Sequence, residues 1–183
     1  DWANNHSAEL TVTNEAAEEF TDSQNFQALP EFQRRNWTLA YQAFSYLQKR
    51  DKLPELSQES IDASMQAHVP GRMEKVKIGG NIIVMDGAHN EQKTNALVSS
   101  FEGLFPDLKV PVMLSLKEGK EFQAVLPKLK SIASELIVTE FEGRQDLPVK
   151  SIAAQQLQEA AKQAGFERII AGPDQDKAFE LFI

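Results

Sequence analysis

Two short segments carry most of the side chains that could do chemistry. The segment DGAHN, residues 86–90, places a carboxylate, an imidazole and an amide directly after the apolar run 82–85. The segment PGRME, residues 70–74, places Arg72 directly after a Pro-Gly pair. A carboxylate at the end of a strand can accept hydrogen bonds from the hydroxyl groups of a ribose, and the planar guanidinium of arginine suits a phosphate. One interpretation of these residue types is therefore a site for a phosphate-bearing ligand such as a nucleotide.

Each of these residues also has a structural interpretation. Asp86 and Gly87 form a common turn dipeptide. Asn90 stands where an N-cap would precede a helix that begins at residue 91. His89 could hydrogen-bond an anion held at that helix N-terminus, or could simply be solvated. Arg72 could pair with a nearby acid such as Glu74, so the residues alone leave both interpretations open.

The elements that would position these residues follow an alternating pattern from residue 70 onward. Residues 73–87 read as a β-hairpin around Gly79 and Gly80. Apolar β-like runs and amphipathic helices then alternate, with strands at 109–116, 135–141 and 168–172 and helices at 91–103, 119–133, 148–165 and 174–183. This pattern predicts an α/β fold, with a Rossmann-like mixed, mainly parallel sheet covered by helices on both faces. In such sheets ligands bind beyond the carboxyl ends of the strands, where residues 86–90 would lie.

The first third of the chain has a different character. Residues 1–30 are polar, with one possible short strand near residues 10–12. Apolar spacing of three and four residues predicts a helix over about 31–50, and a second over about 57–67. We therefore expect a helical segment to precede the α/β part.

Composition and missing motifs exclude several classes of function. The 183 residues carry a formal net charge of −8, which argues against a nucleic-acid partner or an anionic membrane surface. No apolar run is long enough to span a bilayer, and the absence of cysteine fits a reducing compartment, so a cytoplasmic location is expected. The chain has no P-loop, dinucleotide-binding or nucleophile-elbow motif, and no His/Glu pair with helical metal-binding spacing. No metal ligand is therefore expected within these residues.

Taken together, the two segments resemble the carboxyl-terminal domain of folylpolyglutamate synthase and dihydrofolate synthase, enzymes of the Mur ligase superfamily. That family writes this region as a GR-x-E motif, a hairpin and then DGAHN, and this chain has GRME and DGAHN in the same order. The segment FQRRNWTLAYQAF, residues 32–44, resembles a helix that the family places in its preceding ATPase domain. The resemblance covers residues from about 31 to the end of the chain and is strongest over 69–101.

The resemblance implies an ATP-dependent ligase that adds L-glutamate to a folate or dihydropteroate carboxyl group through an acyl phosphate, with Mg²⁺. Arg72 would contact the ATP phosphates, and Asp86 would accept hydrogen bonds from the ribose. His89 would lie near the phosphates or the incoming glutamate, and Asn90 beside it would belong to the nucleotide-binding set. Gln33 and Asn36 would lie near the adenine and phosphates.

The chain departs from the family pattern at three places. Phe32 replaces the histidine of the helix motif, and the loop SLKEGKE after the second predicted strand replaces a KDKD-like loop, so that Lys117 or Lys120 would act there. The family continues past the last helix into one more strand. We therefore expect residues 1–68 to be the tail of the central ATPase domain and residues 69–183 to be the carboxyl-terminal Rossmann-like domain, truncated before its last strand.

These expectations carry consequences for activity and partners. The P-loop, the Mg²⁺ ligands and the folate pocket would lie in an amino-terminal domain outside this sequence, so this chain alone is expected to be inactive. The full-length enzyme is expected to be a monomer. Two alternatives stay open: a Mur-type ligase that adds an amino acid to a peptidoglycan precursor, and a Rossmann-like binding domain without catalytic activity. Gly87 and Glu91 favour the folate branch.

Overall fold

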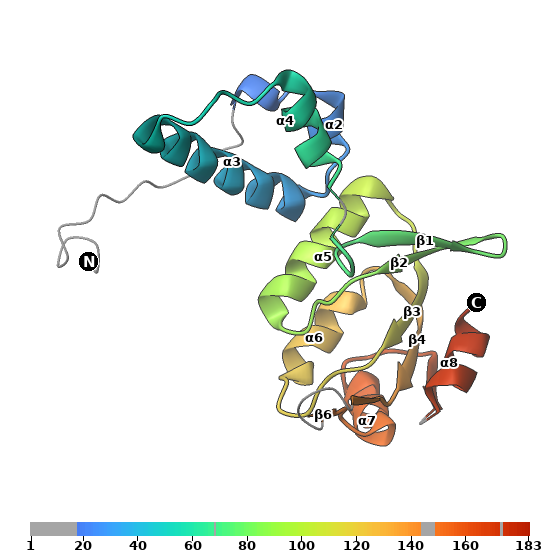
Figure 1. Cartoon of the computed structure of the whole chain (residues 1–183). Helices are drawn as coiled ribbons and strands as arrows, with labels where there is room; N and C mark the ends of the chain where they lie inside the picture. Colours follow the sequence, from blue (N-terminus) through green and yellow to red (C-terminus); the bar gives the residue numbers. More distant parts are fainter. Residues whose placement is uncertain (1–17, 68, 144–148, 173) are drawn as a thin grey trace. The chain divides into compact units, whose positions relative to one another are not determined.

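The chain forms two compact units, residues 1–68 and 69–183. The computed structural model describes residues 18–67, 69–143, 149–172 and 174–183. The strand expected near residues 10–12 lies outside the described residues. Figure 1 labels most of the helices and strands of the two units.

The first unit is helical. It contains a 3-10 turn, Glu18–Phe20, and the helices α2 (Gln24–Gln27), α3 (Glu31–Asp51) and α4 (Gln58–Met65). α3 begins directly after Pro30, whose fixed φ suits a helix start, and ends at Lys52 in a left-handed conformation with φ 53°. The two helices predicted here, over about 31–50 and 57–67, are confirmed as α3 and α4, whereas the 3-10 turn and α2 were not predicted.

An aromatic cluster holds these helices together. Phe20, Phe26, Ile61 and Met65 are buried, and Trp37 and Tyr41 of α3 pack against them. The Trp37 indole donates a hydrogen bond to Ser64 Oγ at 2.9 Å, which ties α3 to α4. Other apolar residues of α3 stay exposed, with Leu39 at 58% of its surface. The apolar spacing therefore predicted the helix correctly, although only part of that face is buried.

The second unit is built on a three-stranded parallel sheet with the order β3-β4-β7. The strands are β3 (Val110–Leu114), β4 (Ala133–Thr139) and β7 (Ile169–Gly172). The helices are α5 (Glu91–Leu104), α6 (Phe122–Leu129), α7 (Ala154–Gln163) and α8 (Gln175–Phe182). Figure 1 shows α5 and α6 on one side of the parallel strands and α8 on the other. The predicted mixed α/β fold with helices on both faces is confirmed.

The core of this unit lies between the sheet and its helices. β4 is the central strand, and Leu136, Ile137 and Val138 on it are essentially inaccessible to solvent. Leu126 of α6 and Leu157 of α7 are equally buried. A fully buried leucine contributes about 1.5–3 kcal/mol through burial alone, so these residues fix the sheet from which the loops described below extend.

Two predicted helices are shorter than the sequence indicated. The helix expected over 148–165 begins only at Ala154, because Val149 and Lys150 form the strand β6, which pairs antiparallel with β5 (Glu142–Gly143). The helix expected over 119–133 begins at Phe122, after Gly119 with φ 82°, and ends at Leu129. In both cases hydrogen bonds in the flanking loops replace the first turns of the helix.

The antiparallel hairpin is the element that carries the candidate site. It consists of β1 (Glu74–Ile78) and β2 (Asn81–Met85), which pair antiparallel, so the hairpin predicted around Gly79 and Gly80 is confirmed. Lys75 lies over the Phe105 ring, 5.4 Å from its centroid, and so links the hairpin to the end of α5. Among the described residues, no strand pairing joins β2 to the parallel sheet. This separation was not predicted.

Candidate functional site

Arg72 lies in a tight turn that enters the hairpin. Gly71 before it has φ 65° and Met73 after it has φ 50°, so both neighbours of Arg72 adopt left-handed backbone conformations. For a residue with a Cβ this conformation costs about 1–2 kcal/mol. Met73 is nevertheless buried, with only 5% of its surface exposed. The Arg72 side chain itself is half-buried.

The Asp86 carboxylate joins this turn to the DGAHN loop. Asp86 Oδ2 accepts a hydrogen bond from the Met73 amide at 2.9 Å, and Asp86 Oδ1 accepts one from the Ala88 amide at 2.8 Å. The Gly87 amide also donates to the Gly71 carbonyl at 2.9 Å. The PGRME turn and the DGAHN loop therefore form one hydrogen-bonded unit, although 13 residues separate Met73 from Asp86.

Glu74 closes the turn from its other end. Its Oε2 accepts a hydrogen bond from the Gly71 amide at 2.8 Å. No site role was predicted for Glu74, Gly71 or Met73. The signal that could have identified Glu74 is its fixed place three residues after the glycine of PGRME, where its carboxylate can reach back to a turn amide.

His89 and Asn90 are the last two residues of the DGAHN loop and lead directly into helix α5. His89 Nδ1 is 2.9 Å from the Gly87 carbonyl, and the imidazole is half-buried. Asn90 is the N-cap of α5, since its Oδ1 accepts a hydrogen bond from the Lys93 amide at 2.9 Å. The capping interpretation of Asn90 is therefore confirmed. A helix N-terminus carries free amides and a partial positive charge, so it favours an anion near His89 and Asn90.

The capping role gives a stability prediction. We expect Asn90→Ala to lower the free energy of unfolding by about 1 kcal/mol, because the Lys93 amide loses its partner. Asn95→Ala, in the exposed middle of the same helix, is the matched control and should be neutral or slightly stabilising, since alanine has the higher helix propensity. Urea unfolding of both variants measures this difference. Equal stability of the two variants would contradict the cap.

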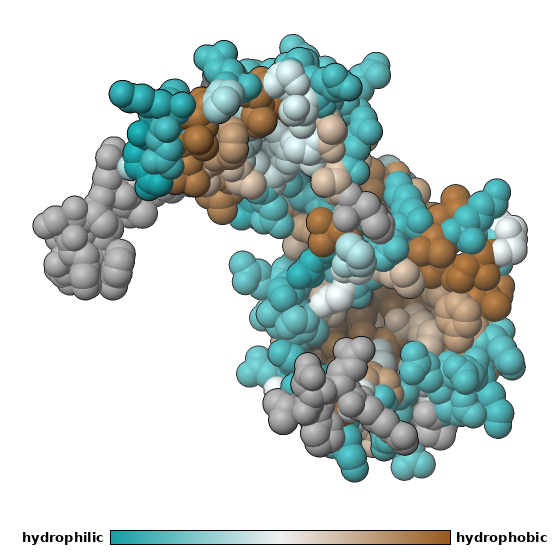
Figure 2. All heavy atoms as spheres, in the orientation of Figure 1, coloured by the Kyte–Doolittle hydropathy of each residue, from teal (hydrophilic) through white to brown (hydrophobic). Residues whose placement is uncertain are grey.

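A large apolar cavity begins beside Asp86. Its volume is about 460 Å³. Asp86 and Ala88 line one end, and the rest of its wall comes from β2, β3, α5, α6 and the end of α8. Figure 2 shows apolar side chains over the hairpin and a hollow with apolar walls below it. The carboxylate therefore stands between a polar turn on one side and an apolar space on the other.

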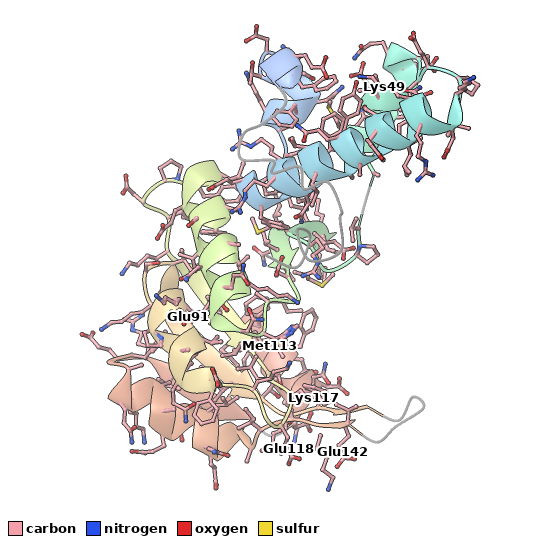
Figure 3. All side chains as sticks on the ribbon, turned by 90° about the vertical axis from the view of Figure 1, so that its left-hand side faces the viewer. Lys49, Glu91, Met113, Lys117, Glu118 and Glu142 are labelled. Atoms are coloured by element: carbon pink, nitrogen blue, oxygen red, sulfur yellow. The ribbon has the colours of Figure 1, made fainter. Side chains whose placement is uncertain are left out.

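Lys117 and Lys120 lie in the loop that follows β3. This loop is tied to β6, because the Glu118 amide donates to the Lys150 carbonyl at 2.9 Å and Lys117 forms an isolated bridge with Ser151. Figure 3 labels Lys117 and Glu118 on the same side of the unit as Glu142, the β5 residue that pairs with Lys150. Lys120 is half-buried. Lys120 lies beyond the carboxyl end of β3, whereas the hydrogen bonds that join the PGRME turn to the DGAHN loop run between Met73, Gly71, Asp86 and Gly87.

The remaining predicted residues lie in the first unit. Gln33 is half-buried and Asn36 is exposed, both on α3. They share one helix, three residues apart, and therefore face the same side of it. Within the described part of the chain, no cluster of three His, Cys, Asp or Glu residues could hold a metal ion. Every helix described is also too short or too polar to cross a lipid bilayer.

Comparisons with known proteins identify the family that the GRME and DGAHN motifs indicated. Residues 71–183 match the family model described as Mur ligase, glutamate ligase domain. The chain is 29% identical over 122 residues to the dihydrofolate synthase/folylpolyglutamate synthase of Bacillus subtilis, an alignment that covers 66% of this chain and 27% of that protein. This chain thus spans about a quarter of the length of that relative.

Solved structures show the same fold. The folylpolyglutamate synthase of Mycobacterium tuberculosis, complexed with ADP and AMPPCP, is similar at a TM-score of 0.58 and 23% identity, over 70% of this chain and 28% of that one. The folylpolyglutamate synthetase of Helicobacter pylori is similar at a TM-score of 0.56 and 21% identity, over 95% of this chain and 43% of that one. The resemblance that GRME and DGAHN indicated is confirmed. The match over 71–183 shows that this chain belongs to the Mur ligase, glutamate ligase domain family.

Proposed function

We propose that this chain is the carboxyl-terminal part of an ATP-dependent ligase that adds L-glutamate to a folate or dihydropteroate carboxyl group. The observation that carries this proposal is the hydrogen-bonded unit of the PGRME turn and the DGAHN loop, within a chain of the glutamate ligase family. The curated relative is a dihydrofolate synthase/folylpolyglutamate synthase, and one similar structure contains ADP and AMPPCP.

The reaction would proceed in two steps. The substrate carboxylate attacks the γ-phosphorus of ATP, and the bond between that phosphorus and the bridging oxygen breaks, so that ADP leaves and an acyl phosphate forms. The amino group of L-glutamate then attacks the acyl carbon, phosphate leaves, and the amine loses a proton to give the amide. Because charge moves onto the transferring phosphoryl group, a fixed cation stabilises the transition state more than the ground state.

The site residues have distinct roles in this proposal. Arg72, held between two left-handed residues, would place its guanidinium against the ATP phosphates. Asp86 keeps acceptor capacity beyond its two amide partners, since a carboxylate offers about four lone-pair sites, so it could also accept ribose hydroxyls. His89 and Asn90, at the N-terminus of α5, would lie near the phosphates or the incoming glutamate.

The other predicted residues would complete the nucleotide site. We assign Gln33 and Asn36 to the side near the adenine and phosphates, and Lys120 to the loop at the sheet's carboxyl edge. Mg²⁺ would accompany ATP and neutralise its phosphates. No cluster in the described residues fits a metal ion, so its ligands would come from elsewhere in the longer protein.

We also propose the domain organisation that the sequence suggested. Residues 1–68 would be the tail of an ATPase domain. The fold likeness to the Helicobacter pylori structure covers 95% of this chain, so it extends over part of these residues and supports assigning them to the same longer protein. Residues 69–183 would be the Rossmann-like domain. A monomeric, cytoplasmic enzyme is our expectation for the longer protein.

The cavity supports one more strand in this domain. β2 and β3 have no strand partner on their cavity sides among the described residues. A right-handed crossover from β7 through α8 leads back toward β3. The Asn81 amide group donates to the Ile183 carbonyl at 2.8 Å, so the end of α8 lies at the start of β2. A strand that follows α8 would therefore enter between β2 and β3, parallel to both.

Nucleotide titration tests the proposed function. We expect the longer protein to bind ATP with a dissociation constant in the range usual for enzyme substrates, about 1 µM–1 mM. ATP hydrolysis should then rise when folate or dihydropteroate is added. A rise only with a peptidoglycan precursor would favour the Mur-type ligase instead. Failure of the longer protein to bind any nucleotide would favour a binding domain without catalytic activity.

A further inference from the structure

The turn around Arg72 is unusual because a buried, non-glycine residue holds its left-handed conformation. Gly71 and Met73 have φ 65° and 50°, and Arg72 stands between them. Glycine adopts this conformation freely, but methionine does not. The Met73 conformation therefore needs compensating contacts, and residues in such conformations gather at functional sites.

Asp86 supplies such a contact to Met73, and two carboxylates in all hold the turn, one on each side of Arg72. Asp86 Oδ2 accepts the Met73 amide at 2.9 Å, and Glu74 Oε2 accepts the Gly71 amide at 2.8 Å. Asp86 is itself fixed, because its Oδ1 accepts the Ala88 amide at 2.8 Å. Hydrogen bonds to ionised acceptors are shorter and stronger than those between neutral groups. The backbone on both sides of Arg72 is thus attached to a carboxylate.

We propose that Asp86 is a positioning residue for Arg72, with Glu74 as its counterpart on the other side of the turn. Removing the Asp86 carboxylate frees the Met73 amide and removes the partner that favours its left-handed backbone. The backbone from which the Arg72 side chain extends then loses one of its two carboxylate attachments. The consequence for catalysis rests on the proposed function, whereas the consequence for the turn does not.

This role differs from that of a ribose ligand in what it predicts. A residue that only accepts ribose hydroxyls contributes equally before and during phosphoryl transfer, so its loss raises the KM for ATP and leaves kcat unchanged. A residue that positions Arg72 affects a contact that strengthens in the transition state, so its loss also lowers kcat. The two roles are therefore separable by experiment.

Amide hydrogen exchange in the 183-residue chain tests the turn directly. We expect the Met73 amide to exchange at least about tenfold faster in Asp86→Ala than in the wild type. Asp86→Asn keeps one acceptor oxygen, so it should fold even where the alanine variant does not, and one of the Met73 and Ala88 amides should lose its protection. For the other side, the Gly71 amide should lose protection in Glu74→Ala but retain it in Glu74→Gln.

Glu102→Ala is the matched control, because it removes an exposed carboxylate from α5 of the same unit. It should leave the Met73 and Gly71 amides unchanged. Wild-type protection of Met73 in both Asp86 variants would overturn the proposal. This result does not depend on any ligase activity.

A double-mutant cycle in the longer protein tests the catalytic consequence. If Asp86 acts through Arg72, Asp86→Ala lowers kcat, and the Asp86→Ala/Arg72→Ala double variant is about as slow as Arg72→Ala alone. If the two losses multiply, and Asp86→Ala changes only the KM for ATP, positioning is wrong and the ribose contact accounts for Asp86. Absence of ligase activity in the wild type would instead refute the proposed function, and hydrogen exchange would still decide the role in the turn.

Discussion

Replacing Arg72 with alanine is expected to lower kcat/KM of the longer protein by about 10²–10³-fold, or about 3–4 kcal/mol of transition-state stabilisation. The reason is that the guanidinium would face a phosphoryl group whose charge shifts during transfer. The backbone that carries Arg72 is held on both sides, by Asp86 and Glu74, so the point from which its side chain extends is fixed before the reaction. Steady-state kinetics with ATP as the varied substrate measures this effect.

Two further variants show whether the guanidinium itself matters. Arg72→Lys keeps the charge but loses the planar fork, so we expect it to recover only part of the activity. Lys77→Ala removes an exposed positive charge from β1 of the same hairpin and should leave the kinetics almost unchanged. An Arg72→Ala enzyme with nearly wild-type turnover would remove Arg72 from the phosphate site.

The 183-residue chain by itself is expected to show no detectable ligase activity. Its sequence contains no G-x-x-x-x-G-K-[ST] loop, so it cannot form the glycine-rich cradle that binds phosphates in P-loop proteins. Positioning and charge neutralisation supply most of the catalysis in phosphoryl transfer, and one side of a nucleotide site provides little of either.

The measurement is the formation of ADP and of a glutamylated folate with ATP, Mg²⁺, L-glutamate and a folate present. The longer protein, assayed in parallel, is the positive control. Glutamylated product from the 183-residue chain alone would contradict the division of the site between two domains.

The sequence predicted the elements whose signals are local. The hairpin around Gly79 and Gly80, helix α5 after its Asn90 cap, and the long helix α3 after Pro30 all occur where the sequence placed them. In each case turn or cap residues stand next to a clear apolar periodicity, so the local preference and the tertiary structure agree.

The predictions from the sequence were wrong where contacts with distant segments override a local structural preference. Val149 fitted a helical pattern, but it pairs with Gly143 in a short antiparallel ladder, and the Ile152 amide donates to the Leu116 carbonyl. These contacts satisfy the backbone groups that a longer α7 would otherwise have used. Among the described residues β3 pairs with β4 alone, and this edge position could not be predicted, because strand order is not encoded in the periodicity of a single strand.

The candidate site likewise combines features that the sequence predicted with features that depend on the tertiary structure. Residue types alone identified Arg72 and Asp86 as chemically capable, and the structure brings their two segments together. Asp86 accepts hydrogen bonds from the Met73 and Ala88 amides because of the local backbone geometry, including the left-handed conformation of Met73. A pattern of side chains does not predict that geometry. The sequence left open whether Asp86 stabilises a turn or binds the ribose of ATP. We propose that it does both.

The most direct measurement is the joining of L-glutamate to a folate or dihydropteroate by the longer protein that carries this chain. We predict that, with ATP and Mg²⁺, glutamylated product, ADP and phosphate appear in equal amounts, and that omitting either L-glutamate or the folate stops product formation. If ATP is not consumed when both acceptors are present, or if an amino acid is joined only to a peptidoglycan precursor, the proposed function is wrong.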